Sequence, residues 1–169
     1  LADEAEAAVK NGAVLLIVSD RQIGQSLIQI PAPLSVGAIQ QRLVATNLRC
    51  DANIIVETGS ARDPHHFAVL IGLGATAVYP YLAYESLARM VSSGAITKPL
   101  RVVTANFRNG INKGLYKIIS KMGISTISSY RCAQLFEAVG FGDEVVDLCF
   151  KGMTSRIGGA TFEHLGEEL

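Results

Sequence analysis

Short apolar runs alternate with amphipathic stretches in the first half of this chain. Residues 13–18, 53–57 and 75–79 are mostly apolar and are bounded by glycine, proline or charged residues. This pattern predicts buried strands of a parallel sheet. Between and beside them, apolar residues recur with a helical period, which predicts helices over 2–11, 35–43, 63–72 and 82–93.

The third of these helices has a clear start signal. Asp63 is followed by Pro64. Aspartate caps free N–H groups, and a proline at the first helical position loses no donor that the helix needs. We therefore expect the helix to begin here, and to end in the glycines Gly72 and Gly74.

Residues 106–140 indicate a helix, a strand and a second helix. One face of the first helix would hold Ile111, Leu115, Ile118 and Met122, and Gly123 suits its end. Residues 124–127 are rich in β-branched side chains, which favours a short buried strand.

A second apolar stripe follows this strand. It predicts a helix capped by Ser128 or Ser129 and ended by Gly140. Its inner face would consist of Cys132, Leu135, Phe136 and Val139, and we expect Phe136, at the centre of this stripe, to belong to the core.

The remaining segments give weaker signals. Residues 94–105 contain Pro99 and a possible strand at 100–103, so we place a domain boundary here, dividing the chain into 1–104 and 105–169. Asp143 is a candidate cap for a short helix through Cys149. Residues 152–160 are glycine-rich and predict a loop, and Thr161 is expected to start a last helix.

Strands that alternate with helices define an α/β fold. Two architectures fit: a partial (β/α) barrel, like part of a TIM barrel, or an open doubly wound sheet. Periodicity alone does not separate them.

Composition narrows the possible functions. Apolar residues make up 49% of the chain, charged residues 18%, and the mean hydropathy is +0.31. The net charge is zero, which argues against binding to nucleic acid or to an anionic membrane. No apolar run is long enough to span a bilayer, and the acidic N-terminus is unlike a signal peptide. The three cysteines are widely spaced, as expected of thiols in a reducing cytoplasm.

The glycine pairs are weak candidates for phosphate binding. Gly72 and Gly74 precede a strand, whereas a phosphate cradle follows a strand and opens a helix, so we expect them only to end a helix. Gly158 and Gly159, with Arg156 nearby, could bind an anion, although a plain loop is the simpler interpretation.

Polar residues at predicted strand ends are better candidates. Asp20 and Arg21 follow one strand, and Glu57 and Thr58 lie at the end of the next. In a barrel these positions face the functional mouth, although structural ion pairs are common there too.

Two histidines, a row of lysines and one cysteine are further candidates. His65 and His66 are adjacent on a helix, so they cannot chelate one metal together; one could line a site or tunnel, although a packing or surface role is the simpler interpretation. Lys113, Lys117 and Lys121 form a stripe that suits a solvated face or docking to a partner domain. We expect Cys132 to be a packed thiol and no nucleophile.

Several segments resemble one family. KGLYKIISKMGIST and SYRCAQLFEAVG, DPHHFAVLIGLGATAVYPYLAYE at 63–85, and SRIGGATFEHLGEE at 155–168 are similar to the large subunit of bacterial NADPH-dependent glutamate synthase. The similarity runs in order over nearly the whole chain. It implies the second half of the central domain, leading into the FMN-binding synthase domain, with a barrel-like fold.

The resemblance implies a function for the parent enzyme. That enzyme makes L-glutamate from 2-oxoglutarate and glutamine-derived ammonia by FMN-dependent reduction, with an iron–sulfur cluster and a small NADPH-oxidising subunit. We expect no catalytic, cofactor-binding or metal residue in this chain. We expect it to scaffold the ammonia tunnel and to dock the synthase domain in the cytoplasmic enzyme, beside the amidotransferase and FMN domains. Alone, it is expected to be inactive. The tunnel candidates are Asp20, Arg21, Glu57, His65 and His66.

Two alternatives stay open at this point. One is a free-standing flavin- or phosphate-binding barrel enzyme, which would need about eight strand–helix units. The other is a regulatory interaction domain without chemistry.

Overall fold

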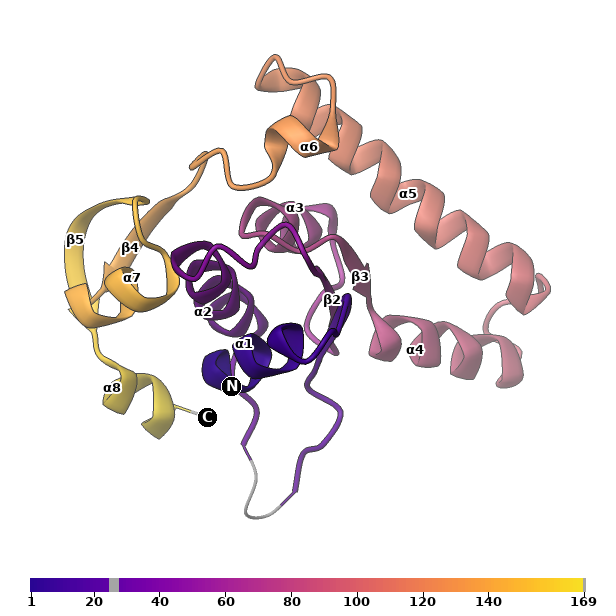
Figure 1. Cartoon of the computed structure of the whole chain (residues 1–169). Helices are drawn as coiled ribbons and strands as arrows, with labels where there is room; N and C mark the ends of the chain where they lie inside the picture. Colours follow the sequence, from indigo (N-terminus) through magenta and orange to yellow (C-terminus); the bar gives the residue numbers. More distant parts are fainter. Residues whose placement is uncertain (25–27, 169) are drawn as a thin grey trace.

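The computed structural model describes residues 1–24 and 28–168. The first part alternates helices and strands (Figure 1): α1 (Ala2–Lys10), β1 (Leu15–Ser19), α2 (Ala32–Ala45), β2 (Asn53–Glu57), α3 (Pro64–Gly72) and β3 (Ala77–Tyr79). The second part contains α4 (Tyr81–Ser92), α5 (Leu100–Lys121), α6 (Ile127–Tyr130), β4 (Glu137–Phe141), α7 (Asp143–Cys149), β5 (Thr154–Ala160) and α8 (Phe162–Glu167). The chain is a mixed α/β protein, as its sequence predicts.

All strand pairs are parallel. β1, β2 and β3 form a three-stranded sheet in sequence order, with Leu16 opposite Ile54 and Val56 opposite Val78. β4 and β5 form a separate two-stranded sheet. The strands of residues 1–24 and 28–168 do not close into a barrel, so the partial-barrel interpretation stays a prediction.

Helices pack against only one face of the three-stranded sheet. Leu16, Ile54 and Val56 point into this core and are at most 9% exposed. On the opposite face Leu15 is 56% and Ile17 67% exposed, so the prediction that this strand is buried throughout is wrong. No element of the described chain covers that face.

Local signals place the ends of the early helices. The Asp63 carboxylate accepts N–H groups of His65 at 2.8 Å and His66 at 3.3 Å, which confirms the predicted start of α3. Leu73 then ends α3, and Gly74 takes φ +123°. α2 begins at Ala32, before the expected Ser35, because prolines are tolerated in a first helical turn.

α5 is one continuous helix of 22 residues, so the strand predicted at 100–103 is wrong. Pro99 stands immediately before its first turn, where the missing N–H costs nothing. Thr104 and Ala105, the proposed domain limits, lie inside this helix. The boundary itself remains a prediction.

The buried face of α5 differs slightly from the predicted one. Ile111, Leu115 and Ile119 are buried, whereas Met122 is 44% exposed. The helix ends with Gly123 at φ +71°, as predicted, and Ile124 N–H donates to the Ile119 carbonyl at 3.1 Å. This is a Schellman end, so Ile124 closes a helix and the strand predicted at 124–127 is wrong.

The helix predicted from Cys132 to Val139 is also wrong. Cys132 and Gln134 have φ values of +58° and +54°, which interrupt any helix, and β4 follows. Ser128 and Ser129 lie inside the short α6 and cap no later helix. The cause is tertiary, because Cys132 N–H bonds to the Gly72 carbonyl at 2.9 Å and ties the segment to the end of α3.

Phe136 nevertheless packs against the core. It is partly buried, its ring lies over Gly72, and its centroid is 6.4 Å from that of the buried Tyr130. The apolar periodicity therefore identified a packed residue while assigning it to the wrong element.

The glycine-rich segment 152–160 is mostly a strand, so the predicted loop is wrong. A Cβ on Gly159 would overlap the Gly140 carbonyl oxygen, so glycine permits a close approach of β5 to β4. The adjoining helices agree with prediction, since α7 spans Asp143–Cys149 and Thr161 caps α8. The residue before α7 is Gly142, so Asp143 stands inside the helix and does not cap it.

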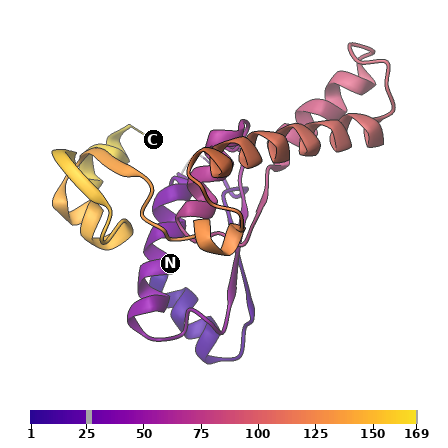
Figure 2. The same ribbon diagram turned by 90° about the horizontal axis from the view of Figure 1, so that it is seen from above.

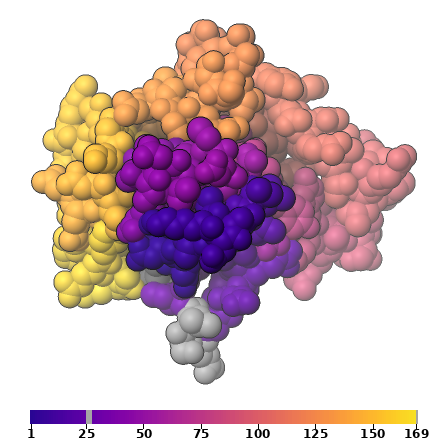
Figure 3. All heavy atoms as spheres, viewed as in Figure 1, coloured from indigo at the N-terminus to yellow at the C-terminus, as the bar shows by residue number. Residues whose placement is uncertain are grey.

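The molecule extends in two opposite directions from the central sheet. Figure 2 shows α4 and α5 projecting on one side, while β4, α7, β5 and α8 lie on the other. The same separation is visible on the surface in Figure 3. Gly114 lets α5 approach α3, since a Cβ there would overlap the ring of Pro64.

Candidate functional site

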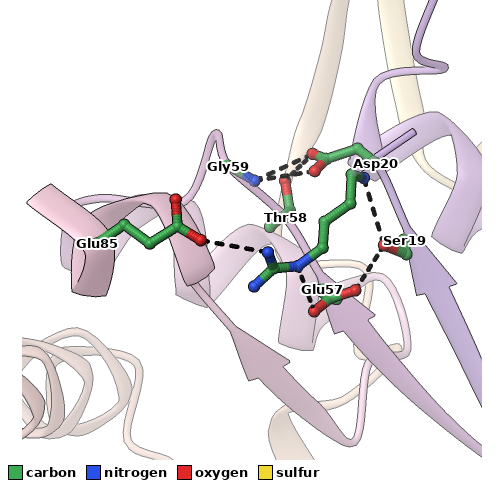
Figure 4. A network of polar contacts seen from close by, with 7 residues as sticks. Ser19, Asp20, Glu57, Thr58, Gly59 and Glu85 are labelled. Carbon is green, nitrogen blue, oxygen red and sulfur yellow. Dashed lines mark hydrogen bonds and ion pairs between the residues drawn. The ribbon is translucent and has the colours of Figure 1, made fainter. Parts of the chain in front are cut away.

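Polar side chains meet where β1, β2 and β3 end. Asp20 and Arg21 follow β1, Glu57 ends β2, and α4 begins just after β3. Because carboxyl ends of parallel strands share one edge of a sheet, these side chains lie close together (Figure 4). We call this group the edge cluster; it comprises Ser19, Asp20, Arg21, Glu57, Thr58, Gly59, Tyr81 and Glu85.

Asp20 bridges from β1 to the turn after β2. Its carboxylate accepts the Gly59 N–H at 3.0 and 3.1 Å and also the hydroxyl of Thr58, which is 1% exposed. The Thr58 hydroxyl lies 2.9 Å from that of Ser60. Asp20 therefore fixes the backbone turn at Thr58 and Gly59.

Arg21 makes the second bridge. Its Nε donates to Glu57 Oε1 at 2.7 Å and its Nη1 to Glu85 Oε1 at 3.2 Å. Its guanidinium carbon lies 4.1 Å from the centroid of the Tyr81 ring, a cation–π contact. The side chain thus joins β1, β2 and α4.

Ser19 completes the second bridge from the β1 side. Its hydroxyl donates to Glu57 Oε2 at 2.6 Å. Figure 4 shows Ser19 and Glu85 on either side of the Glu57 carboxylate. Each oxygen of Glu57 therefore has a donor, which favours a positioning role for this carboxylate over that of a general base.

These contacts shift the proton equilibria of the cluster. Hydrogen bonds from Ser19, then from Arg21, hold the pKa of Glu57 below its ordinary value. The hydrogen bond to Glu57 raises the pKa of Arg21. Burial, and then the nearby Asp20 carboxylate, raises the pKa of the Tyr81 phenol. All three shifts favour the charge states seen in the bridges and none creates a reactive group near neutral pH.

A hollow of about 560 Å³ runs beside the edge cluster. Its lining includes α1, the free side of β1 and residues 28–30. Asp20 and Glu57 stand at one end, while Leu15 and Ile17 contribute apolar surface. Residues 25–27 lie outside the described chain.

The two histidines lie away from Arg21 and Glu57. His66 Nδ1 accepts the Arg62 N–H at 3.2 Å, and His65 packs edge-on to Phe136 at a centroid distance of 6.3 Å. Both border a hollow of about 260 Å³ that also touches Ser60. Ser60 therefore connects this hollow to Asp20 through Thr58.

The described residues do not fit a metal cluster or a flavin cradle. Residues 1–24 and 28–168 contain no group of three His, Cys, Asp or Glu side chains placed to hold a metal. Gln40 Oε1 occupies the position that a Cβ on Gly74 would take, so the space beside that glycine is filled. Gly158 and Gly159 lie within β5, and Arg156 pairs with Glu137 at 3.6 Å.

Two other sequence predictions have clear outcomes. Lys113, Lys117 and Lys121 are all exposed, which agrees with a solvated helix face. Cys132 is exposed, so the prediction of a packed thiol is wrong. Its thiol is still partly shielded from water, and this burial raises the thiol pKa. A raised pKa leaves less thiolate and argues against a nucleophile.

The sequence identifies Asp20, Arg21, Glu57 and Thr58 as candidates but not the partners Ser19, Tyr81 and Glu85. Glu85 and Arg89 stand four residues apart, a spacing that favours an ion pair along one helix, whereas Glu85 pairs with Arg21 across the fold. One signal could have identified Ser19 and Tyr81: each lies one or two residues after a predicted strand, 13–18 and 75–79 respectively. Spacing along a helix therefore does not predict the partner of a side chain when a strand end from another part of the chain lies beside it.

The fold and the edge cluster together define a class of protein: a mixed α/β unit in which polar groups at the strand ends bridge neighbouring elements. Comparisons with known proteins also identify the family. The family model for the glutamate synthase central domain matches residues 1–142, so this chain belongs to that family.

Curated relatives are large multidomain chains. The chain is 43% identical over 165 residues to the glutamate synthase [NADPH] large chain of Bacillus subtilis, covering 98% of this chain and 11% of that protein. It is 41% identical to glutamate synthase [NADH] of Saccharomyces cerevisiae, in a match that covers 97% of this chain and 8% of that protein. It is 44% identical to the chloroplastic ferredoxin-dependent glutamate synthase of rice, in a match that covers 99% of this chain and 11% of that protein. This chain thus spans about a tenth of the relatives' length.

The fold is similar to that of solved structures, among them a flavocytochrome. The chain matches the A198G:L230A mutant of flavocytochrome b2 with pyruvate bound at a TM-score of 0.50 and 16% identity. The match covers 95% of this chain and 40% of that one. At this identity the likeness concerns the fold alone. None of the described helices is both long enough and apolar enough to cross a membrane.

Proposed function

We propose that this chain is the part of a glutamate synthase large chain that scaffolds the passage of ammonia between two active sites. The main support for this proposal is the 43% identity to the Bacillus subtilis large chain across 98% of the sequence. The parent would make L-glutamate from 2-oxoglutarate and glutamine-derived ammonia by an FMN-dependent reduction in the cytoplasm. The partners would be the amidotransferase and FMN domains of the same chain and a small NADPH-oxidising subunit.

The structure supports a scaffold in two ways. The carboxylates of Asp20 and Glu57 are both occupied by internal hydrogen bonds, which suits positioning better than proton transfer. The three-stranded sheet has helices on one face and an apolar open face, as in a wall of a partial (β/α) barrel. FMN and the iron–sulfur cluster would then be held elsewhere in the parent enzyme.

The tunnel role can be tested in a full-length large chain. Arg21→Ala and His66→Ala would be compared with Arg62→Ala, which removes an exposed cation outside the edge cluster. The measured quantity is the ammonia released to solution per glutamine hydrolysed. A tunnel-lining residue, when truncated, should raise this leak while glutaminase activity and ammonia-dependent synthesis persist. A leak unchanged from the control in both variants would contradict tunnel lining.

A second experiment addresses the cofactor. Titrating this chain into FMN should give no saturable quenching of flavin fluorescence, since the strand–glycine–helix turn at Gly142 leads into Asp143 and Glu144, whose carboxylates would repel a phosphate. Saturable quenching at micromolar concentration would favour a flavin-binding protein over a scaffold.

A further inference from the structure

The zero net charge of this chain hides a strong separation of charge. Residues 86–131 contain no Asp or Glu, and we call them the basic arm. Their cations are eight: Arg89, Lys98, Arg101, Arg108, Lys113, Lys117, Lys121 and Arg131. The rest of the chain therefore holds the other seven Lys and Arg and all fifteen Asp and Glu.

Seven of the eight cations of the basic arm are exposed, and Arg131 is half-buried. Arg101, Arg108, Lys113, Lys117 and Lys121 are exposed along α5. None of the eight forms an ion pair within the described chain, whereas Arg21, Arg42 and Arg156 do. Tyr116 and Met122, which are 67% and 44% exposed, add apolar area among the lysines. Apolar anchors such as an exposed tyrosine, surrounded by a polar rim, are typical of a protein interface.

The opposite end of the molecule is acidic. Residues 137–168, here called the acidic lobe, consist of β4, α7, β5 and α8. Only Lys151 and Arg156 are basic there. The lobe carries seven exposed acids: Glu137, Asp143, Glu144, Asp147, Glu163, Glu167 and Glu168. Val139 and Ile157, 58% and 60% exposed, supply apolar area beside them.

The two surfaces lie too far apart to neutralise one another within one molecule. Figures 1 and 3 show the basic arm and the acidic lobe on opposite sides of the central helices. At physiological salt, charges separated by more than about 8 Å are largely screened, so the two surfaces attract each other little within one molecule and gain most from an opposite charge in direct contact. A second copy offers the opposite charge to each.

We propose that the basic arm of one copy docks on the acidic lobe of a second copy of this chain. The arms cannot pair with each other, nor the lobes, because like charges repel. Arm-to-lobe contact instead joins unlike charges and covers apolar area on both sides, and it yields either an antiparallel pair or an open chain of molecules. Such contacts weaken as salt rises.

Two charge-reversed variants test this contact. The arm variant is Lys113→Glu, Lys117→Glu, Lys121→Glu, and the lobe variant is Glu163→Lys, Glu167→Lys, Glu168→Lys. Sedimentation at low ionic strength should show self-association of the unmodified chain, weakened about tenfold or more in either variant alone. An equal mixture of the two variants should associate again, because a negative arm then meets a positive lobe.

Controls separate this contact from other causes. Arg62→Glu reverses an exposed cation on neither surface and should leave association unchanged. Far-ultraviolet circular dichroism must show that both variants are folded. If the arm variant is unfolded, Arg101→Glu replaces it, and if the lobe variant is unfolded, Asp147→Lys replaces it. The proposal is overturned if the unmodified chain is monomeric at low salt, if the mixture fails to associate, or if association strengthens with salt, as contact through the open apolar sheet face would.

Discussion

The two faces of the three-stranded sheet carry similar residues and have opposite environments. On the face toward the helices, Ile54 and Val56 are 0% and 1% exposed. On the other face Leu15 and Ile17, on the neighbouring strand, are 56% and 67% exposed. The difference shows that burial here is set by which elements lie over a strand and not by the hydrophobicity of its residues.

The same alternation divides the edge cluster. Ser19 and Glu57 pair in the register of Leu15 and Ile17, so their bridge belongs to the open face. Thr58 is 1% exposed and continues the covered face. The salt-bridged half of the cluster is therefore in contact with solvent, whereas the half held by Asp20 is largely shielded.

The largest expected effect is at the covered face. Ile54→Ala should lower the free energy of unfolding by about 2–5 kcal/mol, because it removes buried methyl groups and leaves a cavity. Urea unfolding followed by circular dichroism measures it. A loss of less than about 1 kcal/mol would mean that this face is less tightly packed than its burial indicates.

The shielded half of the edge cluster comes next. Asp20→Ala removes the acceptor for Gly59 N–H and for the Thr58 hydroxyl, and should cost about 1–3 kcal/mol. Asp20→Asn keeps one acceptor oxygen and should recover part of that loss. Equal unfolding midpoints for both variants and the parent chain would show that water replaces the carboxylate at no cost.

The open half should show a smaller effect that depends on pH. The folded-state pKa of Glu57 is lowered from 4.5, so its contribution to stability is present above that value and is lost as pH falls through the lower folded-state pKa. Glu57→Gln should therefore be less stable than the parent chain near neutral pH and lose less stability on acidification. Parallel unfolding curves at each pH test this, and an unchanged pH dependence would remove Glu57 as a contributor.

The smallest effect is expected at the exposed face, where an isoleucine is again replaced by alanine. Ile17→Ala should cost less than about 1 kcal/mol, the range of β-propensity differences, because little apolar area is lost. In a full-length large chain the cost should rise if another segment covers this face. Equal costs for Ile17→Ala and Ile54→Ala in this chain would abolish the contrast between the two faces.

Much of the first half was predictable because its signals are local. The cap at Asp63, the helix end at Gly74 and the strand over 53–57 depend on residues close in sequence. The candidates Asp20, Arg21 and Glu57 also follow from a general property of parallel sheets, whose carboxyl ends share an edge. Glu85 escaped prediction because its partner, Arg21, is distant in sequence.

The second half misled for a physical reason. The stripe from Cys132 to Val139 fits a helix, yet the Gly72 carbonyl and β5 capture this segment in an extended form. Gly159 signals a loop by composition but serves the close approach of two strands. Both outcomes depend on what lies across the fold, which local propensity does not contain.

The sequence by itself determined the α/β class, the parallel strands of the first sheet, the helix ends that a cap or glycine encodes, and the family. Only the tertiary structure decided which face of β1 is covered, which partners Arg21 binds, and whether residues 124–160 become helix or strand. Capping and periodicity act within a few residues, so they can be read along the chain. Burial and pairing are set by segments that meet only after folding.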